Sequence, residues 1–227
     1  MSTNRPAAGG GREIIVTVQR FGKWIDGFDT RHTVTGATLG LSGLRVTAED
    51  GSLAVCELPL WGGGPSTPPE GDTRDLIDAF AEQALKPYRV GVLLARRRGF
   101  AVGVFTGDRL TESKVDSSYV QSRTAAGGWS QQRYARRRGN QAAHAAGKAA
   151  DTVHRLLATN IDDLAAVVTA GDRAAVDAIL ADPRLAVLTD KLAPPHIGDI
   201  GEPKLATLKE LPKKFWTVRI HLTEPPD

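Results

Sequence analysis

The sequence is poor in the features that define several classes of protein. Its single cysteine, Cys56, can form neither an internal disulfide nor a cysteine-based zinc site, so we expect a small buried apolar side chain. The longest apolar runs, such as residues 90–95, are far shorter than the roughly 20 residues that cross a bilayer. Residues 1–11 contain no apolar stretch that could serve as a secretory signal. These absences favour a cytoplasmic protein that does not contact a membrane.

Length and composition are ordinary for a globular protein. The chain has 227 residues, of which 41% are hydrophobic and 24% are charged. This composition excludes a collagen, a coiled coil and a wholly disordered chain. The length allows one large domain or two small ones.

Acidic residues are missing from residues 121–150. The surrounding segment, residues 86–150, carries 13 of the 29 Lys and Arg residues but only three of the 26 Asp and Glu residues. Such a basic block indicates a polyanionic partner, most commonly a nucleic acid. The alternative is a solvated basic face that binds nothing.

The first part of the chain reads as a small α+β domain. Hydrophobic alternation predicts strands over residues 13–18, 34–39, 44–48 and 53–58, and apolar side chains at helical spacing predict a helix over 21–32. Residues 61–71 are rich in glycine and proline, and Asp72 is placed to cap a helix that ends near residue 85. We therefore expect a disordered start (1–11), an N-terminal α+β domain (12–70), a linker helix (71–88) and a second domain (89–227).

The second domain reads as an α/β sheet with helices packed on it. The predicted strands are residues 89–95, 100–106 and 109–120, then 164–168 and 215–222. A long helix is predicted over 130–158, a helix capped by Asp172 ends near 180, and a short helix lies near 204–211. The Gly-rich segment 121–129 is a loop before the long helix.

The long helix has two different faces. Arg133, Arg137, Asn140, His144, Lys148, Asp151 and Arg155 follow one another at steps of three or four and share one face. Small and apolar residues, including Ala145, Ala149 and Val153, lie on the other face, which suits packing against a sheet. Arg136 and Arg138 add to the cations of the first turns, where the helix dipole disfavours positive charge. Bound phosphates would compensate this charge.

The loop before this helix combines glycines with glutamines. Gly127 and Gly128 allow the main chain to approach a ligand closely, and Gln131 and Gln132 follow. A glutamine amide carries donors and an acceptor, so it can hold a water in line with an ester without titrating. A plain flexible loop is the alternative to this interpretation.

These residues resemble two related families. A glycine-glutamine loop before a basic helix is similar to the central domain of eukaryotic and archaeal class I release factors. The Gly128-Trp129-Ser130-Gln131 segment resembles more closely the Gly-x-x-Gln pattern of the Vms-like release-factor family of peptidyl-tRNA hydrolases, particularly its actinobacterial branch. The resemblance covers roughly residues 89–222, including the segment 165–172.

The resemblance implies an RNase H-like release-factor domain. The implied activity is hydrolysis of the ester between a nascent peptide and tRNA on a stalled large ribosomal subunit, without a metal or organic cofactor. Catalysis would depend on Gln131 with Gly127 and Gly128, although Gln132 remains an alternative to Gln131. RNA contacts would come from Arg123, Trp129, Arg133, Arg136, Arg137, Arg138 and Lys148. The sequence does not indicate an oligomeric state.

Other interpretations remain open at this point. A non-catalytic ribosome- or RNA-binding protein would keep the basic helix but lack the chemistry. Asp108, Glu112 and Asp116 could hold a metal for a nuclease, because an RNase H-like sheet can host paired carboxylates. The five histidines show no metal-ligand spacing, and we interpret them as structural or solvent-facing. Arg96, Arg97 and Arg98 form either a solvated hairpin tip or a second RNA contact.

Overall fold

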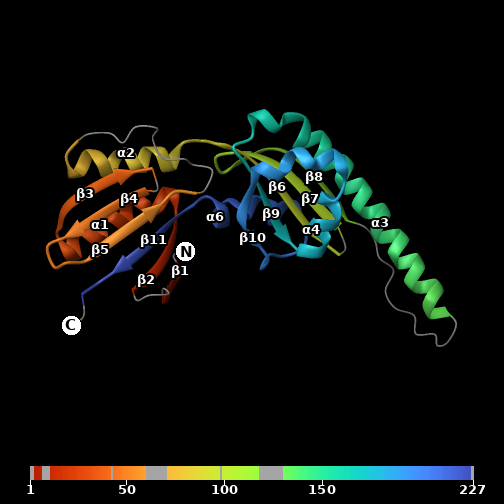
Figure 1. Ribbon diagram of the computed structural model, residues 1–227, viewed down its shortest axis with the longest axis horizontal. Helices are drawn as coiled ribbons and strands as arrows, with labels where there is room; N and C mark the ends of the chain where they lie inside the picture. Colours follow the sequence, from red (N-terminus) through yellow and green to blue (C-terminus); the bar gives the residue numbers. More distant parts are fainter. Residues whose placement is uncertain are drawn as a thin grey trace. The chain divides into compact units, whose positions relative to one another are not determined.

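The structure, a computed structural model, describes residues 3–6, 11–41, 43–59, 71–97, 99–117 and 130–225. In the long helix that begins at Ser130, side chains are described from Ala143 onward. The chain divides into two compact units (Figure 1). Unit 1 comprises Met1–Pro87 and Pro212–Asp227, and unit 2 comprises Tyr88–Leu211.

Unit 1 is built on a six-stranded antiparallel sheet with the order β1-β2-β11-β5-β4-β3. Its elements are β1 (Thr3–Pro6), β2 (Arg12–Thr17), the 3₁₀ helix η1 (Val18–Arg20), α1 (Phe21–His32), β3 (Val34–Gly40), β4 (Gly43–Ala48), β5 (Leu53–Glu57), α2 (Thr73–Leu85), α6 (Pro212–Phe215) and β11 (Thr217–Thr223). The predicted strands and the predicted α1 are confirmed. Residues 3–6 differ from the expected disordered start, because they pair with β2.

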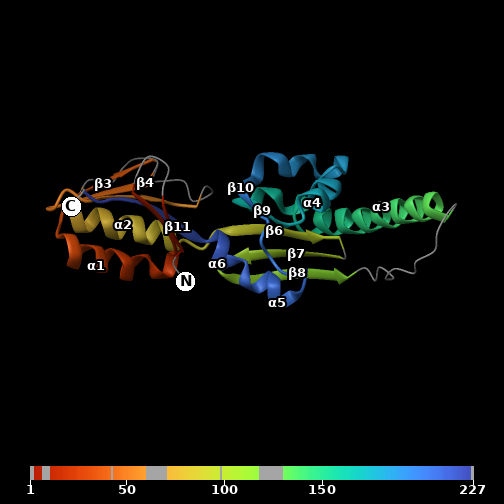
Figure 2. The ribbon, with the colours of Figure 1, turned by 90° about the horizontal axis from the view of Figure 1, so that it is seen from below.

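Both long helices of unit 1 lie on the same face of its sheet (Figure 2). The spacing of Phe21, Ile25 and Phe28 turns their side chains into the core, where each is at most 4% exposed. The ring of Phe21 lies 4.9 Å from that of Phe80 on α2. The predicted cap of α2 is confirmed, since the Asp72 carboxylate accepts hydrogen bonds from the backbone N–H groups of Arg74 and Asp75. Cys56 is buried as expected, and burial raises the pKa of its thiol.

Two segments, β11 and α2, belong to unit 1, although they were expected in the second domain and in a linker. The strand β11 was expected to close the sheet of the second domain, but it lies between β2 and β5 of unit 1. The expected linker helix α2 buries Phe80 and Ala84, and the Ala84 carbonyl accepts a hydrogen bond from the indole of Trp216. Sequence alternation identifies a strand and its buried face, but not its neighbours, which tertiary packing selects.

Deleting residues 212–227 should therefore unfold unit 1. The deletion removes the buried side chains of Val218, Ile220 and Leu222 and leaves one edge each of β2 and β5 without its strand partner. Burial of three such side chains contributes roughly 5–9 kcal/mol, against a total stability of about 5–15 kcal/mol for a domain. Limited proteolysis should show rapid cleavage within residues 12–57. A control chain that ends at Thr223 should resist, and equal resistance of both chains would contradict the expectation.

Unit 2 contains a five-stranded mixed sheet with the order β10-β9-β6-β7-β8. Its elements are β6 (Arg89–Arg96), β7 (Gly99–Thr106), β8 (Arg109–Ser117), α3 (Ser130–Leu156), the 3₁₀ helices η2 (Ala158–Asp163) and η3 (Pro183–Lys191), β9 (Ala166–Gly171), α4 (Arg173–Leu180), β10 (Leu192–Ile197) and α5 (Leu205–Glu210). The first three strands are antiparallel, and β9 and β10 then add parallel to β6. This arrangement confirms the RNase H-like fold.

Helices cover both faces of this sheet. The helices α3 and α4 bury one continuous core with the sheet, in which Val153, Leu157 and Val176 are fully buried. On the opposite face α5 approaches β7 closely, because a Cβ at Gly103 would lie only 2.9 Å from the Leu208 side chain. The middle of the sheet is therefore filled on both sides, and a binding surface must lie at its edges or on its helices.

Two local predictions for unit 2 need correction. The strand β10 was not predicted, because Pro194 and Pro195 lower strand propensity; the structure tolerates them because β10 lies at the edge of the sheet. Asp172 occupies the N-cap position of α4, but its side chain makes no capping hydrogen bond. Its carboxylate instead accepts a hydrogen bond from the backbone N–H of Arg97.

Candidate nucleic-acid interface

The predicted site residues fall on α3 and on the segment before it. Gln131 and Gln132 are in the first turn of α3, and Arg133, Arg136, Arg137 and Arg138 follow within the next two turns. Lys148 is exposed near the middle of the helix. Gly127, Gly128, Trp129 and Arg123 lie outside the described residues, so the catalytic loop remains a prediction.

The second half of α3 is anchored in the core of unit 2. Ala149 and Val153 are at most 1% exposed and share a core with Phe100 and Val102 of β7. The other side of the helix carries exposed residues, namely His144, Lys148, Asp151 and Arg155. The predicted division of the helix into an apolar and a polar face is thus confirmed for the described side chains.

The first half of α3 projects beyond the sheet of its own unit (Figures 1 and 2). At a rise of 1.5 Å per residue, a helix of 27 residues is about 40 Å long. Among the described side chains of α3, full burial begins at Ala149. About 28 Å of helix therefore precede the buried part. The arginine-rich segment and the first-turn glutamines are carried at the free end of this projection.

An ion-pair cluster fastens the anchored half of α3. The guanidinium of Arg184, at the start of η3, lies 2.8 Å from the Asp151 carboxylate and 2.7 Å from that of Asp182. Hydrogen bonds from Arg184 lower the pKa of Asp182 to about 2, and hydrogen bonds to Asp182 and Asp151 raise the pKa of Arg184. The sequence alone did not identify Arg184, because its partner Asp151 lies 33 residues away in the chain.

The lowered pKa of Asp182 predicts a pH-dependent stability. A carboxylate that titrates at a lower pH in the folded chain stabilises the fold above its ordinary pKa of about 4. This stabilisation should disappear as the pH falls from about 4 to about 2. Asp182→Asn should therefore melt at a lower temperature than wild type at pH 7, and the difference should shrink toward zero as the pH falls through about 2. Calorimetry of both proteins across this pH range gives the two melting temperatures. A difference in melting temperature that does not change with pH would be inconsistent with the ion pair.

The acidic residues considered for a metal do not gather in one place. Asp108 lies in the turn before β8, whereas Glu112 and Asp116 lie along β8. Glu112 faces Arg89, with 3.9 Å between its carboxylate and the guanidinium, and Arg89 also contacts Asp163. Within the described ranges no three His, Cys, Asp or Glu residues are placed to hold a metal ion.

One of the histidines, His196, has a structural role in unit 2. His196 of β10 lies 3.0 Å from the Thr169 hydroxyl through Nδ1, and its Nε2 donates to the carbonyl of Gly171 at 2.8 Å. These bonds tie the edge strand to β9. The structural interpretation of this histidine is therefore confirmed.

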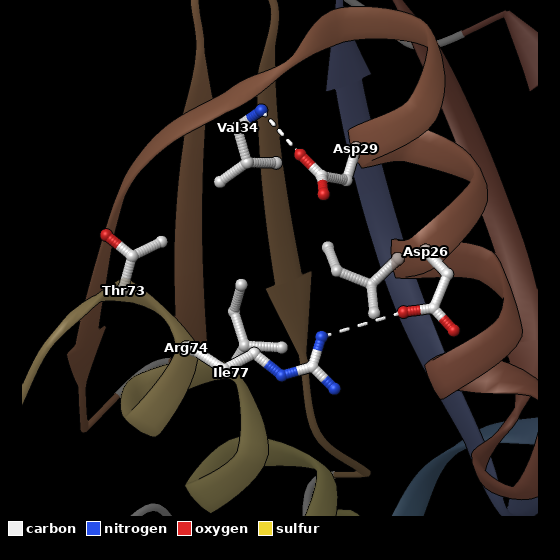
Figure 3. Close-up of a pocket in the computed structure, with 7 residues that line it drawn as sticks. Asp26, Asp29, Val34, Thr73, Arg74 and Ile77 are labelled. Carbon is white, nitrogen blue, oxygen red and sulfur yellow. Dashed lines mark hydrogen bonds and ion pairs between the residues drawn. The ribbon is translucent and has the colours of Figure 1, made fainter.

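Unit 1 contains a small pocket of about 160 Å³ between α1, β3 and α2 (Figure 3). Its polar groups already bind one another. Arg74 lies 3.7 Å from Asp26, and the Asp29 carboxylate accepts a hydrogen bond from the backbone of Val34. Ile25 and Ile77 supply the apolar part of the wall. Each charged side chain that lines the pocket makes an ion pair or a hydrogen bond within unit 1, which does not favour a charged ligand.

The RNase H-like sheet and its long basic helix define a domain of the release-factor type. A family model described as Actinobacteria/chloroflexi VLRF1 release factor matches residues 88–221, which is more than half of the chain. The chain belongs to this family. The match spans unit 2 and extends into β11.

Three archaeal proteins are among the solved structures to which the chain has low sequence identity. An archaeal translation termination factor, aRF1, has 18% identity and a TM-score of 0.40, with 73% of this chain and 47% of that chain covered. A structure described as an archaeal protein has 17% identity, a TM-score of 0.37 and coverages of 75% and 52%. Pelota from Archaeoglobus fulgidus has 11% identity, a TM-score of 0.34 and coverages of 94% and 66%. The chain thus spans about half the length of the first two.

Two further comparisons are negative. No curated protein matches the chain. None of the helices in the described residues combines the length and the apolar composition that spanning a membrane requires.

Proposed function

We propose that the protein hydrolyses peptidyl-tRNA on stalled or obstructed large ribosomal subunits and so releases the nascent chain. Family membership supports a role in translation. The observation that carries the proposal is the form of α3, which is anchored by Val153 and its neighbours and holds Gln131 near its far end, about 27 Å along the helix from the buried part. A projecting arm of this kind suits a reactive group that must reach an ester deep inside a large RNA assembly.

In the proposed reaction, Gln131 orients a water molecule toward the ester carbonyl. The water oxygen bonds to the carbonyl carbon, and the bond from that carbon to the ribose oxygen breaks. The ribose oxygen takes up one proton from the attacking water and becomes a hydroxyl, and the second proton goes to solvent as the peptide leaves as a carboxylate. Gly127 and Gly128 would let the main chain approach the ester closely. Gln131 needs no change of charge, because its amide supplies both donors and an acceptor.

Cations on the arm would hold the RNA. Arg133, Arg136, Arg137 and Arg138 follow the two glutamines, and the exposed Lys148 adds a positive charge at the start of the anchored half. Arginine and lysine bind phosphates independently of base sequence. Arg123 would add a further contact, and Trp129 would stack on a base or ribose at the tRNA end. Binding would therefore depend strongly on salt.

The test is a release assay on purified large subunits that carry peptidyl-tRNA, with tRNA-linked and free peptide resolved on a gel. The proposal expects free peptide in proportion to enzyme, and the same rate with EDTA once ribosomal magnesium is controlled. Binding without release would favour a non-catalytic ribosome-binding protein instead. Cleavage of RNA that EDTA abolishes would identify a metal nuclease. The expected place of action is the cytoplasm, where ribosomes work.

A further inference from the structure

Gly147 lies in the interior of α3, where glycine weakens a helix relative to alanine because it has more conformational freedom to lose. Packing does not require a glycine here. Its backbone is helical, the residue is exposed, and a Cβ added to it would meet no atom within 4 Å. The structure of unit 2 would accept alanine at this position without any rearrangement.

The position of Gly147 along the helix is informative. Immediately after it, Ala149 and Ala150 are at most 2% exposed, and Asp151 is fastened to Arg184. One turn before it, Ala143 is exposed. Between these regions only Ala146 packs partly against the core, through a single methyl group that a small bend would displace at little cost. Gly147 therefore separates the fastened half of α3 from the projecting half.

We propose that Gly147 is a flexible joint at which the projecting half of α3 bends relative to the sheet. A hinge consists of a few residues, often small ones, that absorb the change in φ and ψ when a segment moves. A bend here moves the whole arm while the Asp151–Arg184 contact and the buried alanines stay in place. The role of the joint in catalysis rests on the proposed function: the joint lets Gln131 adjust to the ester after the anchored part of the protein has bound.

The joint can be tested in the free protein by measuring distances between spin labels. One label is attached at Ala135→Cys on the arm and the other at Ala186→Cys, an exposed position of η3. The native Cys56 is fully buried and does not compete for the label. Wild type should give a broad distance distribution, and Gly147→Ala should narrow it while raising the thermal midpoint. A distribution of unchanged width would overturn the proposal.

A matched variant moves the joint instead of removing it. Ala143 lies one turn from Gly147 on the same exposed side, so Ala143→Gly combined with Gly147→Ala should restore the broad distribution. Gly139, the other glycine of α3, is left unchanged in every variant. If the double variant stayed as narrow as Gly147→Ala alone, bending at this turn would not be the cause.

Release measurements then link the joint to the reaction. Gly147→Ala should bind large subunits normally but release peptide more slowly, by up to about 100-fold if Gln131 is misplaced by 1 Å, and the double variant should recover. Normal release by Gly147→Ala would refute the functional part of the inference. If wild type releases no peptide, the proposed function fails, while the label distances still decide whether Gly147 is a joint.

Discussion

Gln131→Ala is expected to lower peptide release by about 100- to 1,000-fold while large-subunit binding stays unchanged. This is the range observed when one positioned hydrogen-bonding group is removed from a reaction centre. Binding should persist because the substitution leaves every arginine of α3 in place. The measurement is single-turnover release from peptidyl-tRNA on large subunits, with binding followed separately by co-sedimentation.

The neighbouring glutamine supplies the matched control. Gln132→Ala removes the same chemical group from the adjacent position of the same helical turn, so both variants change helix propensity equally. We expect release by Gln132→Ala to stay within a few-fold of wild type. Loss of release only in Gln132→Ala would assign the reaction to Gln132. Full release by both variants would contradict an amide-dependent mechanism.

Replacing the four arginines of the arm by glutamine is expected to abolish tight binding to ribosomes. Each phosphate contact contributes about 0.7–0.9 to the slope of log affinity against log salt, so four contacts should lower the slope by about 3. The affinity at low salt should fall by at least tenfold. The changed residues are Arg133, Arg136, Arg137 and Arg138. Equilibrium binding to large subunits between 50 and 200 mM salt provides the measurement.

A control with the same change in net charge separates local contacts from general attraction. It replaces four exposed arginines of other elements by glutamine, namely Arg20, Arg31, Arg45 and Arg109. This control should keep most of the affinity and of the salt slope. If both quadruple variants lost affinity equally, the arm would have no special role in RNA binding, and only the overall charge of the chain would matter.

Local patterns predicted most of the elements correctly because short-range physics determines them. The spacing of Phe21, Ile25 and Phe28 identified α1 and its buried face, and Asp72 marked the start of α2 through its own hydrogen bonds to the next turn. The separation of Lys148 from Ala149 and Val153 on α3 follows in the same way from helical periodicity. These features depend on neighbours within a few residues.

Contacts between distant segments were not predictable in this way. Asp172 was expected to cap α4, but the β6–β7 hairpin brings the backbone N–H of Arg97 within its reach. The strand β10 escaped prediction because its two prolines suit only an edge, and strand order is a property of the whole sheet. The ion pair between Arg184 and α3 could not be predicted, because it forms only when the fold brings η3 beside Asp151.

The sequence by itself determined the class of the fold, the two faces of the long helix and the arginine-rich segment beside Gln131, because periodicity and charge are local properties of a chain. Only the tertiary structure decided that β11 completes the sheet of unit 1, that α2 belongs to that unit, and that the first half of α3 stands clear of its own sheet. The reason is that strand partners and buried surfaces are selected by the packing of segments far apart in the chain, where many weak contacts together outweigh any local preference.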